Sequence, residues 1–190
     1  VKGKQNPNLC MSDYIAPKST GVKDYIGMFA VTSGINAEIY EKIFEKAEDD
    51  YSSIMIKAIT DRLAEAFAEY MHDRIRQDLW GYQTANEIST EDMIKEKYEG
   101  IRPAPGYPAC PEHTVKKDIF ELLKTNEIGM ELTESMAMLP ASSVSGFYFS
   151  HPNSKYFSVG NIDEDQVSDM AKRRDISVDV IKKWLASNLR

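Results

Sequence analysis

A long stretch of helical periodicity, from about residue 49 to residue 79, places the strongest constraint on the fold of this chain. Apolar side chains recur there at steps of three and four residues for about seven turns, the spacing of an amphipathic helix. These apolar positions are Tyr51, Ile54, Met55, Ala58, Ile59, Leu63, Ala66, Phe67, Tyr70, Met71 and Ile75. Asp49 and Asp50 at its start suit the positive end of a helix dipole. The sequence therefore predicts one long helix.

Shorter segments of both types surround this helix. We predict strands at 25–32, 130–139, 144–150 and 156–159, and helices at 37–48, 89–100, 114–124, 164–173 and 177–187. Ser89 opens a capping-box pattern, Gly100 stops the helix that follows it, and residues 1–24 look irregular. Because strands and helices do not alternate regularly, an α+β fold is favoured over a doubly wound sheet.

Composition limits the class of protein. The chain has 190 residues, of which 42% are apolar and 28% charged, as in a single globular domain. Its net charge of −7 argues against nucleic-acid binding, and a helix-turn-helix interpretation of the basic residues 172–174 is disfavoured for the same reason. No run approaches about 18 apolar residues, so we expect no membrane span. The first residues do not resemble a signal peptide.

The two cysteines, Cys10 and Cys110, lie 100 residues apart, without a metal-binding or redox spacing. They predict free thiols in a reducing cytoplasm. The three histidines show no metal-ligand spacing, and the sequence contains no GxSxG, phosphate-binding loop or GxGxxG motif. The common catalytic arrangements are therefore absent, and His151 is expected to lie in an ordinary turn.

The segment GIRPAPGYPACP, residues 100–111, is the most unusual in the chain. Four of the eight prolines fall within it, which predicts a stiff, extended loop that cannot join a sheet interior. The loop presents one guanidinium, on Arg102, and one phenol ring, on Tyr107. A guanidinium can bind a carboxylate with two hydrogen bonds, and a ring can stack on a ligand or face a cation. Two interpretations stay open on these residues alone, a ligand-binding loop and a surface linker.

An acidic line on the long helix is a second candidate feature. Asp61, Glu65 and Glu69 are spaced four residues apart and share one helical face. A solvated face paired with Lys57 and Arg62 is the simpler interpretation. The alternative is a set of carboxylates for the ammonium group of a ligand or for a basic partner surface.

The loop sequence RPAPGYPACPEH, residues 102–113, resembles the signature of the activation domain of cobalamin-dependent methionine synthase. That family carries an Arg-x-x-x-Gly-Tyr pattern that binds S-adenosylmethionine. Further segments resemble the family in the same order, at 13–18, 24–32, 61–70, 132–135 and 150–152. The resemblance covers nearly the whole chain. It implies an α+β fold with a bent antiparallel sheet flanked by helices.

The resemblance implies a function in repair. In this family the domain binds S-adenosylmethionine and supports the reductive remethylation of inactive cob(II)alamin, within methionine biosynthesis. The cobalamin is carried by a neighbouring cobalamin-binding domain, the electron comes from flavodoxin or a flavoprotein reductase, and zinc belongs only to the distant homocysteine-binding module. The expected ligand contacts are Arg102, Ala104, Gly106, Tyr107, Tyr156, Phe157, Glu65 and Glu96. Asp61 is expected to face the cobalamin-binding domain.

The chain also departs from the family pattern. A family glutamate at the partner face falls at Ala37, with Glu38 adjacent, and Phe157 stands where some members have tyrosine. An aspartate that meets the ligand amino group lies in an amino-terminal part with no match here. Residues 1–190 are therefore expected to form a single domain equivalent to the C-terminal part of the activation domain. A module that only docks to the cobalamin-binding domain or to flavodoxin is the alternative function.

Overall fold

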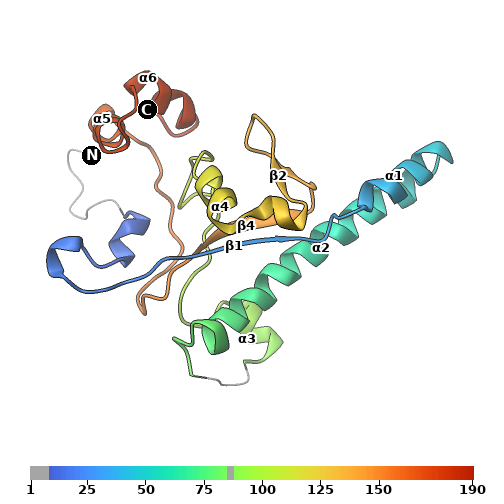
Figure 1. Cartoon of the computed structure of the whole chain (residues 1–190), viewed down its shortest axis with the longest axis horizontal. Helices are drawn as coiled ribbons and strands as arrows, with labels where there is room; N and C mark the ends of the chain where they lie inside the picture. The colour runs from blue at the N-terminus through green and yellow to red at the C-terminus, as the bar shows by residue number, and fades with distance from the viewer. Residues whose placement is uncertain (1–8, 85–87) are drawn as a thin grey trace.

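The computed structural model describes residues 9–84 and 88–190 and has the expected α+β architecture (Figure 1). The helices are α1 (Ala37–Lys46), α2 (Asp50–Arg74), α3 (Thr90–Ile94), α4 (Lys116–Leu123), α5 (Glu164–Arg174) and α6 (Val178–Trp184). Shorter helical turns are η1 (Met11–Tyr14), η2 (Lys18–Thr20), η3 (Ile75–Leu79) and η4 (Thr125–Ile128). The strands are β1 (Gly27–Thr32), β2 (Glu131–Leu132), β3 (Met138–Leu139) and β4 (Ser143–Tyr148).

An antiparallel pair, β1 and β4, lies at the centre of the molecule. The register runs from Gly27 opposite Tyr148 to Thr32 opposite Ser143. In Figure 1 the pair crosses between α4 and α2, so that each face of the sheet is covered by one helix. The face toward α4 belongs to the main apolar core, which includes Tyr14, Ile101, Cys110, Ile119, Phe120, Met130, Phe147 and Phe149. Antiparallel strands flanked by helices are thus confirmed.

The long helix is confirmed, but its apolar stripe does not form its buried face. Helix α2 continues through the π-helical turn η3 to Leu79, as predicted. The buried residues of α2 are instead small or polar, namely Ser53, Thr60, Ala64, Ala68 and His72. Ala68 packs on Phe29 and Tyr148, whose rings stack at 4.8 Å. Because these two aromatic rings fill the space between strand and helix, only small side chains fit at the closest approach.

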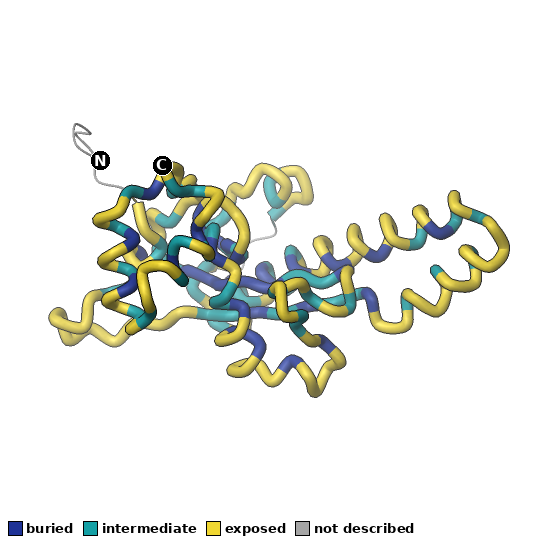
Figure 2. The backbone as a smooth tube through the Cα atoms, turned by 90° about the horizontal axis from the view of Figure 1, so that it is seen from above, coloured by how far each residue is buried: buried dark blue, intermediate teal, exposed yellow. Residues whose placement is uncertain are grey.

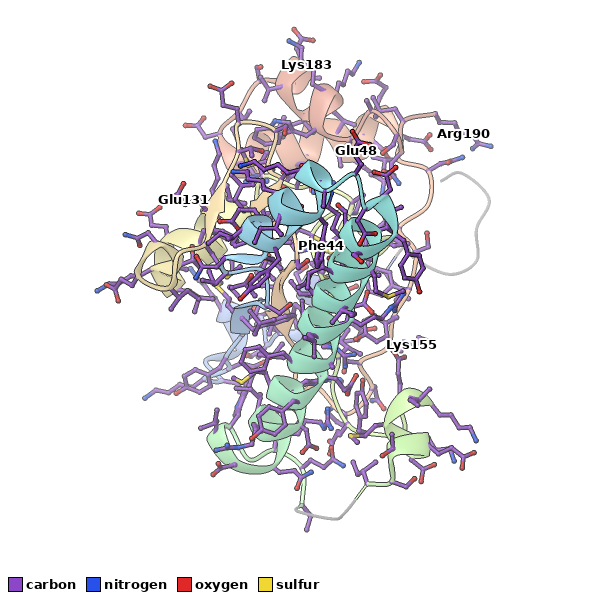
Figure 3. All side chains as sticks on the ribbon, turned by 90° about the vertical axis from the view of Figure 1, so that its right-hand side faces the viewer. Phe44, Glu48, Glu131, Lys155, Lys183 and Arg190 are labelled. Atoms are coloured by element: carbon purple, nitrogen blue, oxygen red, sulfur yellow. The ribbon has the colours of Figure 1, made fainter. Side chains whose placement is uncertain are left out.

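Helices α1 and α2 form a hairpin that extends away from the rest of the molecule (Figure 2). Figure 3 views this hairpin from its tip, with Glu48 at the turn between the two helices. Glu48 has a left-handed backbone (φ 55°), which ends α1 before residue 48, and Asp49 caps α2 by accepting from the Ser52 N–H at 3.0 Å. Lys57 on α2 lies 3.4 Å from Glu41 on α1 and links the two helices.

Two strand predictions and one helix boundary were wrong. The segment 130–139 forms the hairpin β2–β3, because residues 133–137 turn, with Met136 in a left-handed conformation. Among the residues that the structure describes, the segment 156–159 pairs with no strand. This segment is held against the proline-rich loop by the Val159 N–H, which donates to the Pro108 carbonyl at 2.9 Å. The helix expected at 89–100 ends at Ile94, since Glu96 takes a left-handed conformation.

Candidate functional site

The proline-rich loop begins as a third strand on the edge of β4. The Ile101 N–H donates to the Phe149 carbonyl at 3.0 Å, and the Phe149 N–H donates back at the same distance. Two residues later the Pro103 carbonyl accepts from the Phe147 N–H at 2.9 Å. Proline has no N–H to complete that second pair, so the ladder ends here and the chain leaves the sheet. The loop lies at the sheet edge, as its prolines predict.

A tight turn follows and gives the loop its shape. The Gly106 N–H donates to the Cys110 carbonyl at 2.7 Å, and the Cys110 N–H donates to the Tyr107 carbonyl at 2.9 Å. Gly106 has φ +94°, and a Cβ atom placed on it would lie 2.1 Å from Cε1 of His113. Both the backbone conformation and the close approach of the ring therefore require glycine.

The loop and the extended segment that begins at Tyr156 enclose a cavity of about 330 Å³. Its lining contains Arg102, Ala104, Tyr107, Tyr156 and Phe157, five of the eight side chains or backbone positions predicted to bind ligand. The rest of the lining is proline, alanine and valine, so the walls are mainly apolar. The hydroxyl of Tyr156 accepts from the backbone N–H of Arg102 at 3.0 Å and joins the two segments. The volume lies within the usual range for small-molecule sites.

The guanidinium of Arg102 is held by three side chains. Nη1 donates to the Tyr98 hydroxyl at 2.7 Å and to Nδ1 of His72 at 3.2 Å, and Nη2 forms an ion pair with Glu69. Burial disfavours the charged guanidinium, but Tyr98 and Glu69 outweigh burial and raise the pKa of Arg102. Arg102 is therefore a fixed positive charge with a defined orientation. Nε and the second N–H of Nη2 have no hydrogen-bond partner among the described residues.

His72 is a neutral acceptor for Arg102. Its ring is fully buried and stacks on Tyr148 at 5.2 Å. Burial, together with the positive charges of Arg76 and Arg102, lowers the pKa of His72 to about 2. An arginine only donates hydrogen bonds, so Nδ1 of His72 must accept and the ring proton must sit on Nε2. Nε2 then donates to the Tyr82 hydroxyl at 3.2 Å.

A second arginine contacts Tyr98, which belongs to the same hydrogen-bond network. Arg76 is fully buried, donates to Asp73 at 2.9 Å, and lies over the Tyr98 ring at 3.9 Å from its centroid. This cation–π contact is the main compensation for Nε and Nη1 of Arg76, which have no hydrogen-bond partner among the described residues. Burial raises the pKa of Tyr98 to about 12, so its hydroxyl keeps its proton. Tyr98 thus lies between two guanidinium groups and accepts from one of them.

The acidic line of α2 runs along the same side of the helix as this site. At one end Asp61 accepts from the Ser142 hydroxyl at 2.7 Å, and at the other Glu69 binds Arg102. Glu65 lies between them on the same helical face, at 62% side-chain exposure, and pairs with Arg62 at 2.7 Å. Ser142 directly precedes β4, whose Val144 lines the cavity. The line therefore borders the cavity, and the carboxylate of Glu65 stays outside its lining.

The sequence matches the family model described as vitamin B12 dependent methionine synthase, activation domain, over residues 1–175. This chain belongs to that family. Its structure is similar to one described as the MetH reactivation domain bound to AdoHcy, with a TM-score of 0.94 and 54% sequence identity. The alignment covers 99% of this chain and 58% of that one. The activation-domain fold and family membership are thereby confirmed, whereas the chain spans little more than half the length of the structure it matches.

The remaining predicted contacts of the activation domain take different places around the cavity. Gly106 forms the turn between Ala104 and Tyr107 without lining the cavity. Glu96 is exposed just after α3 and lies outside the lining. Burial raises the pKa of the Tyr156 phenol, and the nearby Arg102 opposes this shift. The negative charge of Glu96 raises the pKa of the phenol further, so the carboxylate of Glu96 acts on Tyr156.

Sequence reasoning missed three side chains that position Arg102. Glu69 was assigned only to the acidic line, and His72 and Tyr98 had no role. The signal that points to one of them, His72, is the spacing of Ala64, Ala68 and His72, four residues apart, on the face of α2 that packs on the sheet. A polar ring that continues a line of alanines is expected to be buried and hydrogen-bonded. Tyr98 lies in an irregular segment, and its sequence carries no such signal.

Other candidate chemistry is not assembled in the structure. His151 accepts from the Asn153 N–H at 3.1 Å through Nδ1, as a residue in a turn. Burial raises the pKa of the Cys110 thiol to about 12, which leaves it protonated and unreactive. Within residues 9–84 and 88–190, no group of three or more His, Cys, Asp or Glu side chains is placed to hold a metal ion. None of the helices described is long and apolar enough to cross a bilayer.

Proposed function

We propose that this activation domain binds S-adenosylmethionine in the cavity between the proline-rich loop and Tyr156, and supplies its methyl group for the repair of cob(II)alamin. One observation carries the proposal: five residues expected to contact this ligand, which come from two distant segments, line one cavity beside an oriented guanidinium. The similar MetH reactivation domain, solved with AdoHcy bound, supports the same ligand class.

The amino-acid end of the ligand is assigned to Arg102. Two N–H groups of its guanidinium, on Nε and Nη2, are free of the Glu69–Tyr98–His72 network. They form one edge of the planar group, the geometry that binds a carboxylate with two parallel hydrogen bonds.

The remainder of the ligand is assigned to the aromatic and apolar lining. The rings of Tyr107 and Tyr156 are 66% and 40% exposed, which leaves area for an adenine or ribose to cover. Ala104 and Gly106 offer backbone contacts, and Phe157 packs beside them. Glu65 and Glu96 place negative charge near a ligand that carries a sulfonium and an ammonium group, which favours the cationic ligand electrostatically.

The chemistry requires no nucleophile from this chain. One electron and the sulfonium methyl group together convert cob(II)alamin to methylcobalamin and leave S-adenosylhomocysteine. The sulfonium is an activated leaving group, so the task of this domain is to hold the methyl group toward the cobalt.

The proposal extends to the full enzyme, a cobalamin-dependent methyltransferase of methionine biosynthesis. The cobalamin-binding domain carries the cobalamin, and Asp61 is the residue of this chain assigned to its interface. Flavodoxin or a flavoprotein reductase supplies the electron in the cytoplasm, and zinc is confined to the homocysteine-binding module. Asp61 is bound to Ser142 next to β4, so a partner at this position would lie close to the ligand cavity.

Calorimetric titration of S-adenosylmethionine into the 190-residue chain tests the proposal. Arg102→Ala should weaken binding by about 1.5–3 kcal/mol, the range for a charge-assisted hydrogen bond, or roughly 10- to 150-fold. The matched control is Arg173→Ala on α5, whose guanidinium is 75% exposed, pairs with Asp169 of the same helix and does not line the cavity. Far-UV circular dichroism establishes that each variant is folded.

Equal affinities of the wild-type chain and Arg102→Ala would refute the site. Failure of the folded wild-type chain to bind would refute an independent site and favour the docking-module alternative. The observation behind that alternative is that the match covers only 58% of the similar chain.

A further inference from the structure

A fully buried charge lies close to the arginine assigned to the ligand. Arg76, in the π-helical turn η3, has no exposed side-chain surface, and its one ion-pair partner among the described residues is Asp73. Asp73 is 29% exposed and also accepts from Gln77 at 2.6 Å, so it does not depend on Arg76. Nε and Nη1 of Arg76 have no hydrogen-bond partner among the described residues. Because a buried guanidinium with unpaired N–H groups lowers the stability of the folded state, stability does not account for Arg76.

The side chain of Arg76 places the ring of Tyr98. Its guanidinium lies over this ring, 3.9 Å from the centroid, in the geometry of a cation–π contact. The edge contact between Tyr98 and His72, with ring centroids 5.1 Å apart, holds the ring from a second side. Tyr98 follows α3 in an irregular segment, so no helix or strand fixes its position. Its orientation therefore depends on two side chains, His72 and Arg76, which lie four residues apart on one continuous helix.

The position of Tyr98 in turn determines how Arg102 is presented. The Tyr98 hydroxyl accepts from Nη1 of Arg102 at 2.7 Å, and Nδ1 of His72 accepts from the same nitrogen at 3.2 Å. Nη2 is paired with Glu69. These contacts leave the edge formed by Nε and the second N–H of Nη2 for a carboxylate. If Tyr98 moved, Nη1 would lose its closer acceptor, and the guanidinium would lose part of the orientation that lowers the entropic cost of binding.

We propose that Arg76 is a positioning residue for the ligand carboxylate, and that it acts through Tyr98 and Arg102 without touching the ligand. This inference rests on the proposed assignment of the S-adenosylmethionine carboxylate to Arg102. Arg76 does not line the cavity, so its effect is confined to the carboxylate end of the ligand. The charge of Arg76 has a second effect in the same direction. Together with burial it lowers the pKa of His72 to about 2, which keeps Nδ1 of His72 an acceptor for Arg102.

Two ligands that differ only in the carboxylate test the proposal. Calorimetry measures the affinity of S-adenosylmethionine and of decarboxylated S-adenosylmethionine for the wild-type chain, Arg76→Met and Arg74→Met. Methionine is unbranched and packs well on an aromatic ring, so it fills the space beside Tyr98. Arg76→Met should weaken S-adenosylmethionine binding about 3- to 10-fold, as for the loss of one average hydrogen bond, and leave the affinity for the decarboxylated ligand unchanged. Arg74→Met is the matched control, because it removes the same charge from a side chain that is 44% exposed, and it should change neither affinity.

A double-mutant cycle identifies the route from Arg76 to the ligand. Tyr98→Phe keeps the ring on which Arg76 lies and removes the hydroxyl that accepts from Arg102. This variant alone should reproduce the loss of S-adenosylmethionine affinity, and adding Arg76→Met should weaken binding no further. Urea unfolding gives an independent readout. The midpoint of Arg76→Met should equal or exceed that of the wild-type chain, because a buried charge with unpaired N–H groups is removed.

The orientation of Arg102 can also be measured without ligand. In a chain with isotope-labelled arginine, NMR should show slowly exchanging Nη protons of Arg102, assigned by their loss in Arg102→Ala, and these protons should exchange faster in Arg76→Met. A wild-type chain that binds neither ligand would refute the proposed function, and the Arg102 protons would then decide the positioning role alone.

Three results would overturn the positioning role. The first is an unchanged exchange rate of the Arg102 protons in Arg76→Met. The second is a wild-type affinity of this variant for S-adenosylmethionine, or an equal loss for both ligands, which would indicate a general structural role. The third is failure of Arg76→Met to fold, because Arg76 would then be required for stability.

Discussion

Lowering the pH should destabilise this domain through His72, and the effect tests the network that orients Arg102. His72 is buried among Arg76, Arg102, Tyr82, Tyr98 and Tyr148, and it is neutral because burial and the two arginines lower its pKa to about 2. In the unfolded chain the same side chain titrates at its ordinary pKa of 6.5. Between these values the unfolded state binds one more proton than the folded state, so stability is complete above pH 6.5 and falls as the pH drops.

The size of the effect follows from the two pKa values. Below pH 6.5 the free energy of unfolding should fall by up to about 1.4 kcal/mol per pH unit from this single group. From pH 7 to pH 5 the contribution of His72 integrates to about 2 kcal/mol. That loss is a large fraction of the stability of a typical domain, so it is measurable by denaturant titration.

The assay is urea unfolding of the wild-type chain and His72→Gln at pH 7 and pH 5. Glutamine can accept from Arg102 and donate to Tyr82, so it keeps both hydrogen bonds and removes the titration. The difference between the two proteins cancels the carboxylates and His113, which titrate in both. His151→Gln is the matched control, because it makes the same replacement at a histidine that has no hydrogen bond to Arg102 or Tyr82. An identical pH dependence in His72→Gln and the wild-type chain would refute a neutral, accepting His72.

Two further predictions concern the proline-rich loop. Gly106→Ala should reduce the free energy of unfolding by about 1–3 kcal/mol and weaken S-adenosylmethionine binding, because the new methyl group meets His113 and the residue has a positive φ. Gly160→Ala is the control. Gly160 also has a positive φ, but the space around it is open, so this substitution should cost less. Denaturant titration and calorimetry of both variants would show whether the costs differ. Arg174→Ala should cost about 3 kcal/mol, since it leaves the carboxylate of Glu112, 5% exposed, with the Thr114 N–H but without its charged partner at 2.7 Å. Thermal unfolding measures this cost, and a change within about 0.5 kcal/mol would contradict it.

The sequence predicts most elements of this fold because their signals are local. Helical spacing locates α2 and η3 to within a residue or two, and a β-rich apolar run locates β1. The two wrong strand predictions also have physical reasons. The segment 130–139 carries the composition of one strand, but Met136 turns the chain back and makes two. The segment that begins at Tyr156 is extended because it binds the loop through Arg102 and Pro108, contacts that no local pattern encodes.

The candidate site was predicted in part for the same reason. The loop residues Arg102, Ala104 and Tyr107 are adjacent in sequence, and the family resemblance adds Tyr156 and Phe157. The groups that orient the guanidinium come from α2 and from Tyr98, and their roles depend on how the helix rotates over the sheet. A periodic pattern shows which residues share a face of the helix, but it does not show which face meets the strands. The sequence therefore does not show that Glu69 and His72 are partners of Arg102.

The rotation of α2 over the sheet depends on its line of small residues. If the apolar line of Ile59, Leu63 and Phe67 faced the sheet, the long side chains of Leu63 and Phe67 would occupy the space in which Phe29 and Tyr148 now stack, and the acidic line would turn away from Arg102. The small line of Ala64 and Ala68 permits a close approach, which places the carboxylate of Glu69 beside Arg102. The same packing that leaves Leu63 and Phe67 exposed therefore orients Arg102 for a carboxylate.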